Sequence, residues 1–260
     1  MSEMSNIDFT VNYFLFDIVV CVGPYDMDII KSSLPLIKKN IIGYRNIYLI
    51  CASPNENIEN VIIINENIFP FTISNIHDFF GNNSNRSGWY LQQLLKLYAG
   101  FYIPGILKRY LVIDADTHFL KPTKFISDDG KYYFNTASEY HIPYFEHMNR
   151  LHPSFKKHHP SSGICHHCFF DSYLVKEMMD LVENYYFNRM PFWIIFLNVL
   201  DVKHYLFSGA SEYELYFNYI YSRHHDKMII RNLKWKNSGV LDENNNHDYD
   251  YVSLHFYLRK

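Results

Sequence analysis

The segment Tyr110–Pro122 (YLVIDADTHFLKP) joins an apolar run to two carboxylates. Arg109–Ile113 predicts a strand, and Asp114 and Asp116 follow it directly. Ligands of open α/β sheets bind at the carboxyl ends of the strands, so we expect both carboxylates to face one crevice. Paired hard oxygen ligands suit Mg²⁺ or Mn²⁺, and these ions in turn suit a diphosphate. The alternative is a solvated aspartate pair, because Asp-x-Asp is common by chance.

Strand and helix patterns alternate on both sides of this segment. Alternation at this spacing indicates an α/β fold with a mostly parallel sheet. We expect one continuous domain over residues 1–260 with a mixed central sheet. The predicted strands are Phe14–Val22, Asn46–Ala52, Val61–Ile64 and Tyr251–Phe256. The first predicted helix runs from Asp26 to a break near Pro35, and the second covers Ser87–Tyr98 and ends at Gly100 after a polar loop at Asn82–Arg86. Two further helices are predicted over Ser172–Arg189 and from Ser211 onward.

The composition excludes several classes of protein. Of the 260 residues, 48% are apolar and 20% charged, which argues against disorder, collagen and coiled coils. The net charge of −3 does not suggest nucleic acid as a partner. No apolar stretch approaches the roughly 18 residues of a membrane span. Phe9–Gly23 lacks the basic region of a signal peptide, and Cys21 and Cys51 lie in strand-like runs, so we expect a cytoplasmic protein with buried thiols.

The Asp-x-Asp segment resembles the metal-binding DxD motif of GT-A glycosyltransferases, which use nucleotide-sugar donors. Together with Arg86–Lys96 (RSGWYLQQLLK), Ser162–His167 (SGICHH) and Ser211–Tyr216 (SEYELY), it resembles a poorly characterised family of GT-A transferases from bacteria and large DNA viruses. The resemblance covers nearly the whole chain. It implies a Rossmann-like GT-A fold, a Mn²⁺ or Mg²⁺ cofactor and a nucleoside-diphosphate sugar, with UDP favoured. The acceptor would be a hydroxyl of a glycan, protein or small molecule, in the host cytoplasm if the protein is viral.

The resemblance also implies a third metal ligand. GT-A enzymes often complete the metal shell with a histidine near the C-terminus, and His255 follows an apolar strand at the matching place. Asp114, Asp116 and His255 would then hold the ion. A strand-end histidine bonded to the backbone is the alternative. Arg259 and Lys260 follow where glycogenin-like transferases place a lysine on the diphosphate, but the longer motif around that lysine is missing here.

Donor-binding residues are expected on the first strand and on the helix before the Asp-x-Asp strand. Arg86 opens that helix, and its forked guanidinium suits phosphate or sugar hydroxyls. Trp89, Gln93 and Lys96 continue the same stripe; a solvent-exposed helix face is their alternative, and we favour it for Lys96. Gly23 ends the first strand where GT-A folds place the nucleobase. The donor-binding candidates are Gly23, Tyr25, Arg86, Gln93 and Asp114. Tyr25 or Asp26 would contact a uridine or guanosine, and the alternative is a plain turn followed by a helix that Asp26 caps.

Two motifs supply the candidate residues for the acceptor side of the site. Ser211–Glu214 matches a capping box, which makes Glu214 structural and leaves Glu212 as the candidate general base. Cys165–Cys168 encloses two histidines, but neighbouring side chains diverge, so a zinc site is disfavoured. His166 and His167 are then structural or acceptor-side residues. The catalytic candidates are Glu212, His167 and Asp114.

Two other functions were weighed against the transferase. Haloacid-dehalogenase-type phosphatases also carry Asp-x-Asp after a strand, but their pattern places Thr or Val where His118 stands, and their motif tends to open the domain. A non-catalytic GT-A-like module that binds a glycan or protein stays open, because 18% aromatic residues suit carbohydrate stacking. The sequence does not indicate an oligomeric state.

Overall fold

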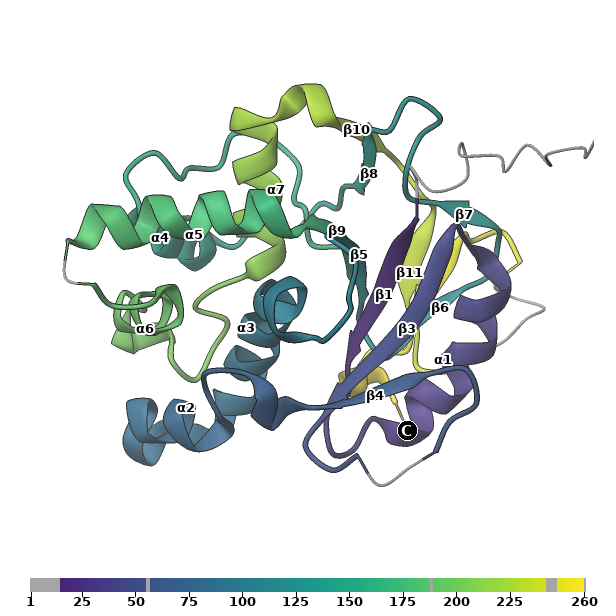
Figure 1. The fold of residues 1–260 in the computed structure, drawn as a ribbon, viewed down its shortest axis with the longest axis horizontal. Helices are drawn as coiled ribbons and strands as arrows, with labels where there is room; N and C mark the ends of the chain where they lie inside the picture. The colour runs from purple at the N-terminus through teal and green to yellow at the C-terminus, as the bar shows by residue number, and fades with distance from the viewer. Residues whose placement is uncertain (1–14, 55–56, 188, 242–246, 260) are drawn as a thin grey trace, which may run out of the picture.

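The central sheet has five strands in the order β4-β3-β1-β5-β9 (Figure 1). The computed structural model describes residues 15–54, 57–187, 189–241 and 247–259. β1, β3, β4 and β5 are parallel, and β9 runs antiparallel to β5. The predicted α/β fold with a mixed central sheet is therefore confirmed. The strands are β1 (Phe16–Cys21), β3 (Tyr44–Cys51), β4 (Ile62–Asn65), β5 (Arg109–Ile113) and β9 (His167–Asp171).

The inner strands are nearly continuous apolar runs because both faces of the sheet are covered. All six residues of β1 are buried, and the exception to their apolar character is Asp17. The Asp17 carboxylate pairs with Arg45 at 2.7 Å and accepts a hydrogen bond from the backbone N–H of Leu107, also at 2.7 Å. A buried carboxylate at the start of β1 is thus compensated, and it fastens two connecting segments to the sheet.

Helices cover both faces of the sheet. Figure 1 shows α1 beside β3 on one side and α3 with its neighbouring helices on the other. Buried apolar residues from both layers form one contiguous core with the sheet. The helices are α1 (Met27–Asn40), α2 (Ile73–Phe80), α3 (Ser87–Tyr102), α4 (Ile142–Leu151), α5 (Ser172–Tyr186), α6 (Phe192–Asn198) and α7 (Glu212–Arg223). Short 3₁₀ segments are η2 (Glu66–Ile68), η3 (Gly81–Arg86), η4 (Val202–His204), η5 (His225–Lys227) and η6 (Phe256–Leu258).

Several local predictions were wrong. α3 does not end at Gly100 but continues to Tyr102, and α5 ends at Tyr186 rather than at Arg189. The first helix does not break near Pro35 but continues through it to Asn40. Ile30, Leu34 and Ile37 lie buried on one side of α1, and this packing offsets the backbone hydrogen bond that proline cannot make. The predicted polar loop at Asn82–Arg86 belongs to the 3₁₀ segment η3. Phe14, the predicted start of the first strand, lies outside the described residues.

A smaller sheet brings the C-terminal segment to the Asp-x-Asp turn. β12 (Tyr251–Ser253) pairs antiparallel with β6 (Thr117–Phe119), which follows that turn, and parallel with β11 (Trp235–Asn237). In Figure 1 the yellow C-terminal segment accordingly lies beside the carboxyl end of β1. Two further strand pairs are β8 (Tyr132–Asn135) with β10 (Met228–Arg231), and β2 (Ile41–Ile42) with β7 (Thr123–Lys124).

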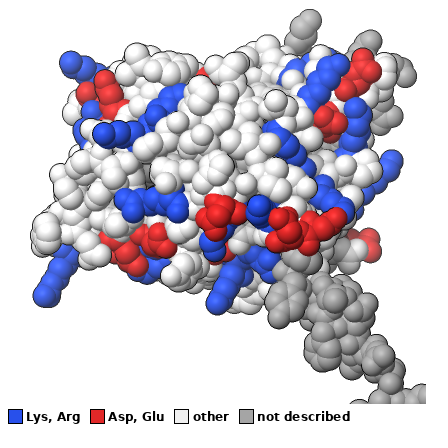
Figure 2. All heavy atoms as spheres, turned by 90° about the horizontal axis from the view of Figure 1, so that it is seen from above, with Lys and Arg blue, Asp and Glu red and all other residues white. Residues whose placement is uncertain are grey.

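The order of the parallel strands reverses between β1 and β5. Chain order runs outward from β1 through β3 to β4 on one side, and β5 lies on the other. Such a switch point leaves a crevice at the carboxyl ends of the strands, where ligands of doubly wound sheets bind. Figure 2 shows acidic and basic side chains intermingled on the face seen from above. In the described part of the chain, every helix is too short or too polar to cross a membrane.

Candidate active site

The Asp114–Asp116 turn is fixed by backbone hydrogen bonds from two distant segments. The N–H of Asp114 donates to the carbonyl of His166 (2.9 Å), and the N–H of Leu254 donates to the carbonyl of Asp116 (2.9 Å). Within the turn, the N–H of Thr117 donates to the carbonyl of Asp114 (3.0 Å). The two carboxylates are therefore presented by a backbone that the neighbouring strands hold in place.

A cavity of about 850 Å³ opens above this turn. Its volume falls within the range of roughly 300–1,000 Å³ that is usual for small-molecule sites. The lining combines opposite charges with aromatic rings, because it draws on the ends of β1 and β5, on α3, on the start of α7 and on the C-terminal segment. Among the lining residues are Arg86, Trp89, Lys96, Asp114, Asp116, Glu212 and His255.

Asp114 is tied to groups on three other elements. Its Oδ1 atom accepts hydrogen bonds from the Lys96 ammonium (2.7 Å) and from the Tyr213 hydroxyl (2.8 Å). Its Oδ2 atom lies 3.5 Å from Nδ1 of His166. Burial alone would raise the pKa of Asp114, but Lys96 and His166 outweigh it and hold that pKa well below its usual range. Asp114 is thus kept ionised in the cavity wall.

Lys96 lies at the centre of this network, which corrects the expectation of a solvent-exposed position. Its residue exposure is 4%, and its ammonium also lies 2.8 Å from Oε1 of Glu212. Burial lowers the pKa of Lys96, but the carboxylates of Asp114 and Glu212 more than compensate and raise it. A buried ammonium between two carboxylates is compensated on both sides, and a surface role is excluded.

Glu212 begins α7 and faces the cavity. Ser211 occupies the N-cap, and its hydroxyl accepts a hydrogen bond from the N–H of Glu214 (3.2 Å). Burial raises the pKa of Glu212, and the Lys96 ammonium opposes that shift. The carboxylate of Glu214 does not complete the predicted capping box; it is buried and accepts hydrogen bonds from Ser162 and Lys157. Glu214 is structural, as predicted, but through the 157–163 loop.

Gln93 was expected to contact the donor, but the structure places its neighbour Gln92, and not Gln93, at the cavity. Gln93 is 2% exposed, and its Oε1 atom accepts a hydrogen bond from the N–H of Glu212 (3.1 Å), so it joins α3 to α7. Gln92 lines the cavity instead. Successive side chains on a helix are rotated by about 100° about its axis, so neighbouring residues face different directions. The stripe that faces the cavity therefore runs through Arg86, Trp89, Gln92 and Lys96.

Asp116 is held by the C-terminal segment. The Ser253 hydroxyl donates to its Oδ1 atom (3.0 Å), and Nη2 of Arg259 lies 3.4 Å from its Oδ2 atom. The same guanidinium donates from Nη1 to Asp26 (3.2 Å). The Asp26 side chain makes no cap hydrogen bond to α1, so its alternative role as a helix cap is wrong. Lys260 lies outside the described residues.

The two neighbouring histidines point to different environments. His166 has a positive φ of 64°, and its ring lines the cavity. His167 is buried in the core, where its Nε2 atom lies 3.1 Å from Oδ1 of Asn135 and burial lowers its pKa to about 3. β9 begins at His167, and His166 precedes it in the left-handed region, so the two side chains leave the backbone in different directions. The predicted catalytic position of His167 is therefore not at the cavity, and His166 is.

The cysteines of the same motif belong to the core. Cys165 and Cys168 are buried free thiols, and burial raises the pKa of Cys165 to about 12. Cys21 and Cys51, the thiols expected to be buried in strands, are buried as well.

The remaining donor-side candidates are distributed around the rim. Arg86 donates from Nη2 to the Ser208 hydroxyl (3.1 Å), its guanidinium lies 4.7 Å from the centre of the Trp89 ring, and its buried Nε atom has no partner among the described residues. Tyr25 lines the rim with 93% exposure. Gly23 lines a neighbouring cavity, and a Cβ atom there would lie 2.9 Å from Oδ2 of Asp26.

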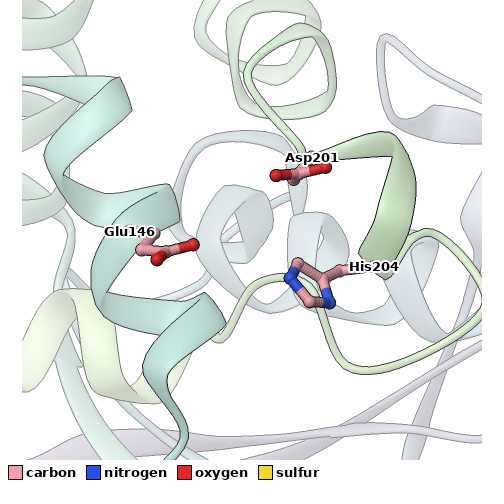
Figure 3. A group of neighbouring side chains, drawn as sticks. All are labelled: Glu146, Asp201 and His204. Atoms are coloured by element: carbon pink, nitrogen blue, oxygen red, sulfur yellow. The ribbon is translucent and has the colours of Figure 1, made fainter.

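The predicted metal ligands share the cavity without converging on a point. Asp114, Asp116 and His255 all line it. Within the described residues, however, the one group of three whose ligand atoms lie within 4.8 Å of one another is Glu146, Asp201 and His204 (Figure 3). Magnesium is commonly held by one or two carboxylates plus substrate phosphates rather than by a complete protein cage. The cavity residues therefore fit a metal ion whose coordination shell is completed by a diphosphate. Burial lowers the pKa of His255, which favours the neutral form of the imidazole that binds metals.

Several residues at the cavity were not selected from the sequence. Tyr213 holds Asp114, and Glu139 and Trp235 line the wall. Burial raises the pKa of Glu139, although the residue as a whole is exposed. Tyr213 lies between the two glutamates of the capping box, but nothing in that motif points to its hydroxyl.

Comparison with known proteins identifies a family and one distant structural neighbour. One solved structure with a similar chain path is that of mouse xyloside xylosyltransferase 1 in its apo form. It is 10% identical with a TM-score of 0.49, over 95% of this chain and 99% of the other. No curated protein matches the chain in sequence. The model of a family of unknown function, DUF6492, matches residues 43–248, which is more than half of the chain, and the protein therefore belongs to that family.

Proposed function

We propose that the protein is a glycosyltransferase that moves a sugar from a nucleoside-diphosphate sugar to an acceptor hydroxyl. One observation carries the proposal: the Asp114–Asp116 turn closes the carboxyl end of β5 at the reversal of strand order and lines a cavity of ligand size. The resemblance of the DxD segment and its neighbours to GT-A transferases points the same way. The bacterial or viral origin and the UDP-sugar donor that it also implies stay predictions.

The charges around the cavity suit a diphosphate. Arg86 lines it from the start of α3 and Arg259 from the C-terminal segment, and Lys96 adds a third cation in its wall. Lys96 is engaged by two carboxylates, whereas Arg86 has a buried Nε atom without a partner among the described residues. Planar guanidinium groups match phosphate oxygens bidentately. We assign Arg86 and Arg259 to the diphosphate, with Arg259 exchanging its contact with Asp116 for phosphate oxygen.

The carboxylates of the turn suit a divalent ion beside that diphosphate. Asp116 and His255 would hold Mn²⁺ or Mg²⁺, and Asp114 would assist directly or through water. When bound, such an ion neutralises the charge that develops on the leaving diphosphate. The Lys96 ammonium keeps Asp114 ionised, the Tyr213 hydroxyl helps to orient it, and the Ser253 hydroxyl orients Asp116. The protein groups around the turn therefore fix the ligands before the donor arrives.

Transfer also needs a group that accepts the proton of the acceptor hydroxyl. In the proposed reaction the acceptor oxygen bonds to the anomeric carbon, the bond from that carbon to the diphosphate breaks, and the proton passes to a carboxylate. Glu212 remains our first candidate, because it lines the cavity and burial raises its pKa. Glu139, on the same wall, is a second candidate, and His166 is a third.

Donor hydrolysis and transfer measured in parallel test these roles. Wild-type protein with Mn²⁺ should cleave a UDP- or GDP-sugar. Arg86→Ala should weaken donor use without removing the metal dependence. Glu212→Gln should lose transfer but retain slow hydrolysis, since water needs less positioning than an acceptor. Glu183→Gln, a carboxylate away from the main cavity, is the matched control. Full transfer by Glu212→Gln moves the base assignment to Glu139 or His166.

The alternative function is a non-catalytic module with the same fold. A binding module would retain affinity for a glycan or protein but would not need a carboxylate pair supported by Lys96, Tyr213 and Ser253. If the wild-type protein with Mn²⁺ neither binds nor cleaves any common UDP- or GDP-sugar, the transferase proposal fails and the binding module takes its place.

A further inference from the structure

A second cavity of about 450 Å³ adjoins the main one. It lies at the carboxyl ends of β1 and β3, and its walls are largely apolar: Val22, Ile50, Ala52, Ile73, Leu91 and Leu95. Cys21, Asp26, Trp89 and Gln92 line both cavities, so the two spaces meet along α3. The Oε1 atom of Gln92, at that junction, is buried without a partner among the described residues. A ligand extending from one space into the other would meet an unfilled acceptor there.

Glu66 places a carboxylate in this apolar cavity. It begins η2 directly after β4, and its side chain is partly buried. Burial raises the pKa of Glu66, and no donor among the described residues offsets that effect. The other carboxylate in the lining, Asp26, is already paired with Arg259. The Glu66 carboxylate is therefore open to a ligand that enters the apolar cavity and supplies N–H donors.

We propose that the second cavity holds the nucleobase of the donor and that Glu66 selects guanine, in place of the uracil that the GT-A resemblance favours. This inference rests on the proposed function, because the main cavity must hold the diphosphate for the base to reach its neighbour. A carboxylate accepts two parallel N–H groups best, as it does from a guanidinium. Guanine offers such a pair in N1–H and its exocyclic amine. Uracil offers one N–H between two carbonyl oxygens, and adenine and cytosine place an acceptor beside their amine.

Gly88 supplies an independent probe of where the base lies. It lines the second cavity but not the main one, and a Cβ atom there would meet nothing within 4 Å. A leucine at position 88 would therefore project into open space. Gly88 lies in the first turn of α3, where replacing glycine favours the helix rather than weakening it. Gly88→Leu should fill the base subsite while the protein stays folded.

The experiment is calorimetric titration of the full chain with GDP and UDP in the presence of Mn²⁺. Wild-type protein should bind GDP about tenfold more tightly than UDP or better, which is the discrimination expected of a bidentate contact to a base. Glu66→Gln should lose that preference, because its amide presents a donor where guanine has one too. Glu59→Gln, an exposed carboxylate outside both cavities, should keep it, and Gly88→Leu should weaken both nucleotides at least tenfold.

The outcomes separate this inference from the proposed function. If UDP binds as tightly as GDP, if Glu66→Gln keeps the preference, or if Gly88→Leu binds both normally, the base assignment is overturned and the transferase proposal is untouched. If no nucleoside diphosphate binds wild-type protein that melts cooperatively, the proposed function fails and this inference fails with it.

Discussion

Two groups of carboxylates and imidazoles occupy different regions of this protein, and they differ in what surrounds them. Glu146, Asp201 and His204 lie on α4 and around η4, with their ligand atoms within 4.8 Å of one another and their side chains pointing together (Figure 3). Asp114 and Asp116, with His255, do not converge in that way, but they line a cavity of about 850 Å³. The first group resembles a metal site in its geometry and the second in its surroundings.

The two groups differ in the partners of their charged side chains. In the cavity, Asp114 and Asp116 are oriented by Lys96, Tyr213 and Ser253. At the surface group, Glu146 is exposed, and its cationic neighbour is Arg150, with Nη1 at 4.0 Å. An exposed pair at that distance contributes little. The partly buried carboxylates of Asp114 and Asp116, in contrast, are held by side chains that are themselves buried. We therefore take orientation within a cavity, rather than convergence alone, as the mark of the functional site.

The largest expected effect comes from removing one carboxylate from each group. Asp116→Asn should lower sugar transfer by roughly 1,000-fold or more, since the diphosphate charge then lacks a ligand for its counter-ion. Asp201→Asn should change transfer by less than about twofold. Steady-state kinetics at saturating Mn²⁺ compares the two variants. A larger loss for Asp201→Asn than for Asp116→Asn would reverse the assignment of the two groups, and equal losses would contradict the distinction between them.

The second largest difference is expected in the stability contributed by the ion pairs of the two groups. Lys96→Met leaves the carboxylates of Asp114 and Glu212 near each other without their shared partner, and should lower the free energy of unfolding by about 3–5 kcal/mol. Glu146→Gln breaks the exposed contact with Arg150 and should cost less than about 1 kcal/mol. Urea denaturation measures both. A Lys96→Met variant as stable as wild type would show that the network is not a structural unit.

A pH titration compares the exposed and buried sides of α4, where Glu146 and His147 are neighbours. His147 is fully buried, its Nε2 atom lies 2.8 Å from the carbonyl of Phe196, and burial lowers its pKa to about 4. Because this pKa is below the unfolded value, the unfolded chain binds the proton more tightly, and stability falls as the pH drops from about 6.5 toward 4. The loss should reach roughly 3 kcal/mol.

His147→Gln removes this titration and serves as the comparison. The difference in unfolding free energy between wild type and His147→Gln, measured by urea denaturation at pH 7 and pH 4.5, should shrink at the lower pH. A difference that stays constant with pH would mean that His147 accepts a proton within the fold at no cost.

The smallest effect is expected from removing the Ser253 hydroxyl, which orients the Asp116 carboxylate. Ser253→Ala removes the hydroxyl that donates to Oδ1 of Asp116 and should weaken Mn²⁺-dependent nucleotide binding about tenfold, as expected when a group that orients a metal ligand is lost. Ser154→Ala, on the loop after α4, should leave that binding unchanged. Titration of the nucleotide at fixed Mn²⁺ compares them. Unchanged binding by Ser253→Ala would mean that the backbone of the turn alone orients Asp116.

The bounds of β5, which precedes the Asp114–Asp116 turn, were predicted correctly from the sequence, whereas the side chains that line the cavity around the turn were not. Arg109–Ile113 is a strand in the prediction and in the structure, because a short apolar run before two aspartates has few other interpretations. Lys96 was misjudged because a lysine on a helix is normally solvated, and only the tertiary structure brings two carboxylates to it from β5 and α7.

Other errors were of one residue, and they have a geometric cause. Gln93 and His167 were chosen where Gln92 and His166 line the cavity. A shift of one position turns a helix side chain by about 100°. His166 lies just before β9 at a positive φ, so motif spacing without known element boundaries cannot separate the two histidines. The partners of Glu214 come from a loop some 50 residues earlier, and no local pattern indicates them.

The most direct test of the account is the position of manganese in crystals of the protein grown with Mn²⁺ and a nucleoside diphosphate. Anomalous scattering at the manganese edge locates the ion without assumptions about the ligands. We predict a peak beside Asp116 in the main cavity, shared with the diphosphate. A peak at Glu146, Asp201 and His204 with none at Asp116 would contradict the central claim that the Asp114–Asp116 turn is the metal and donor site.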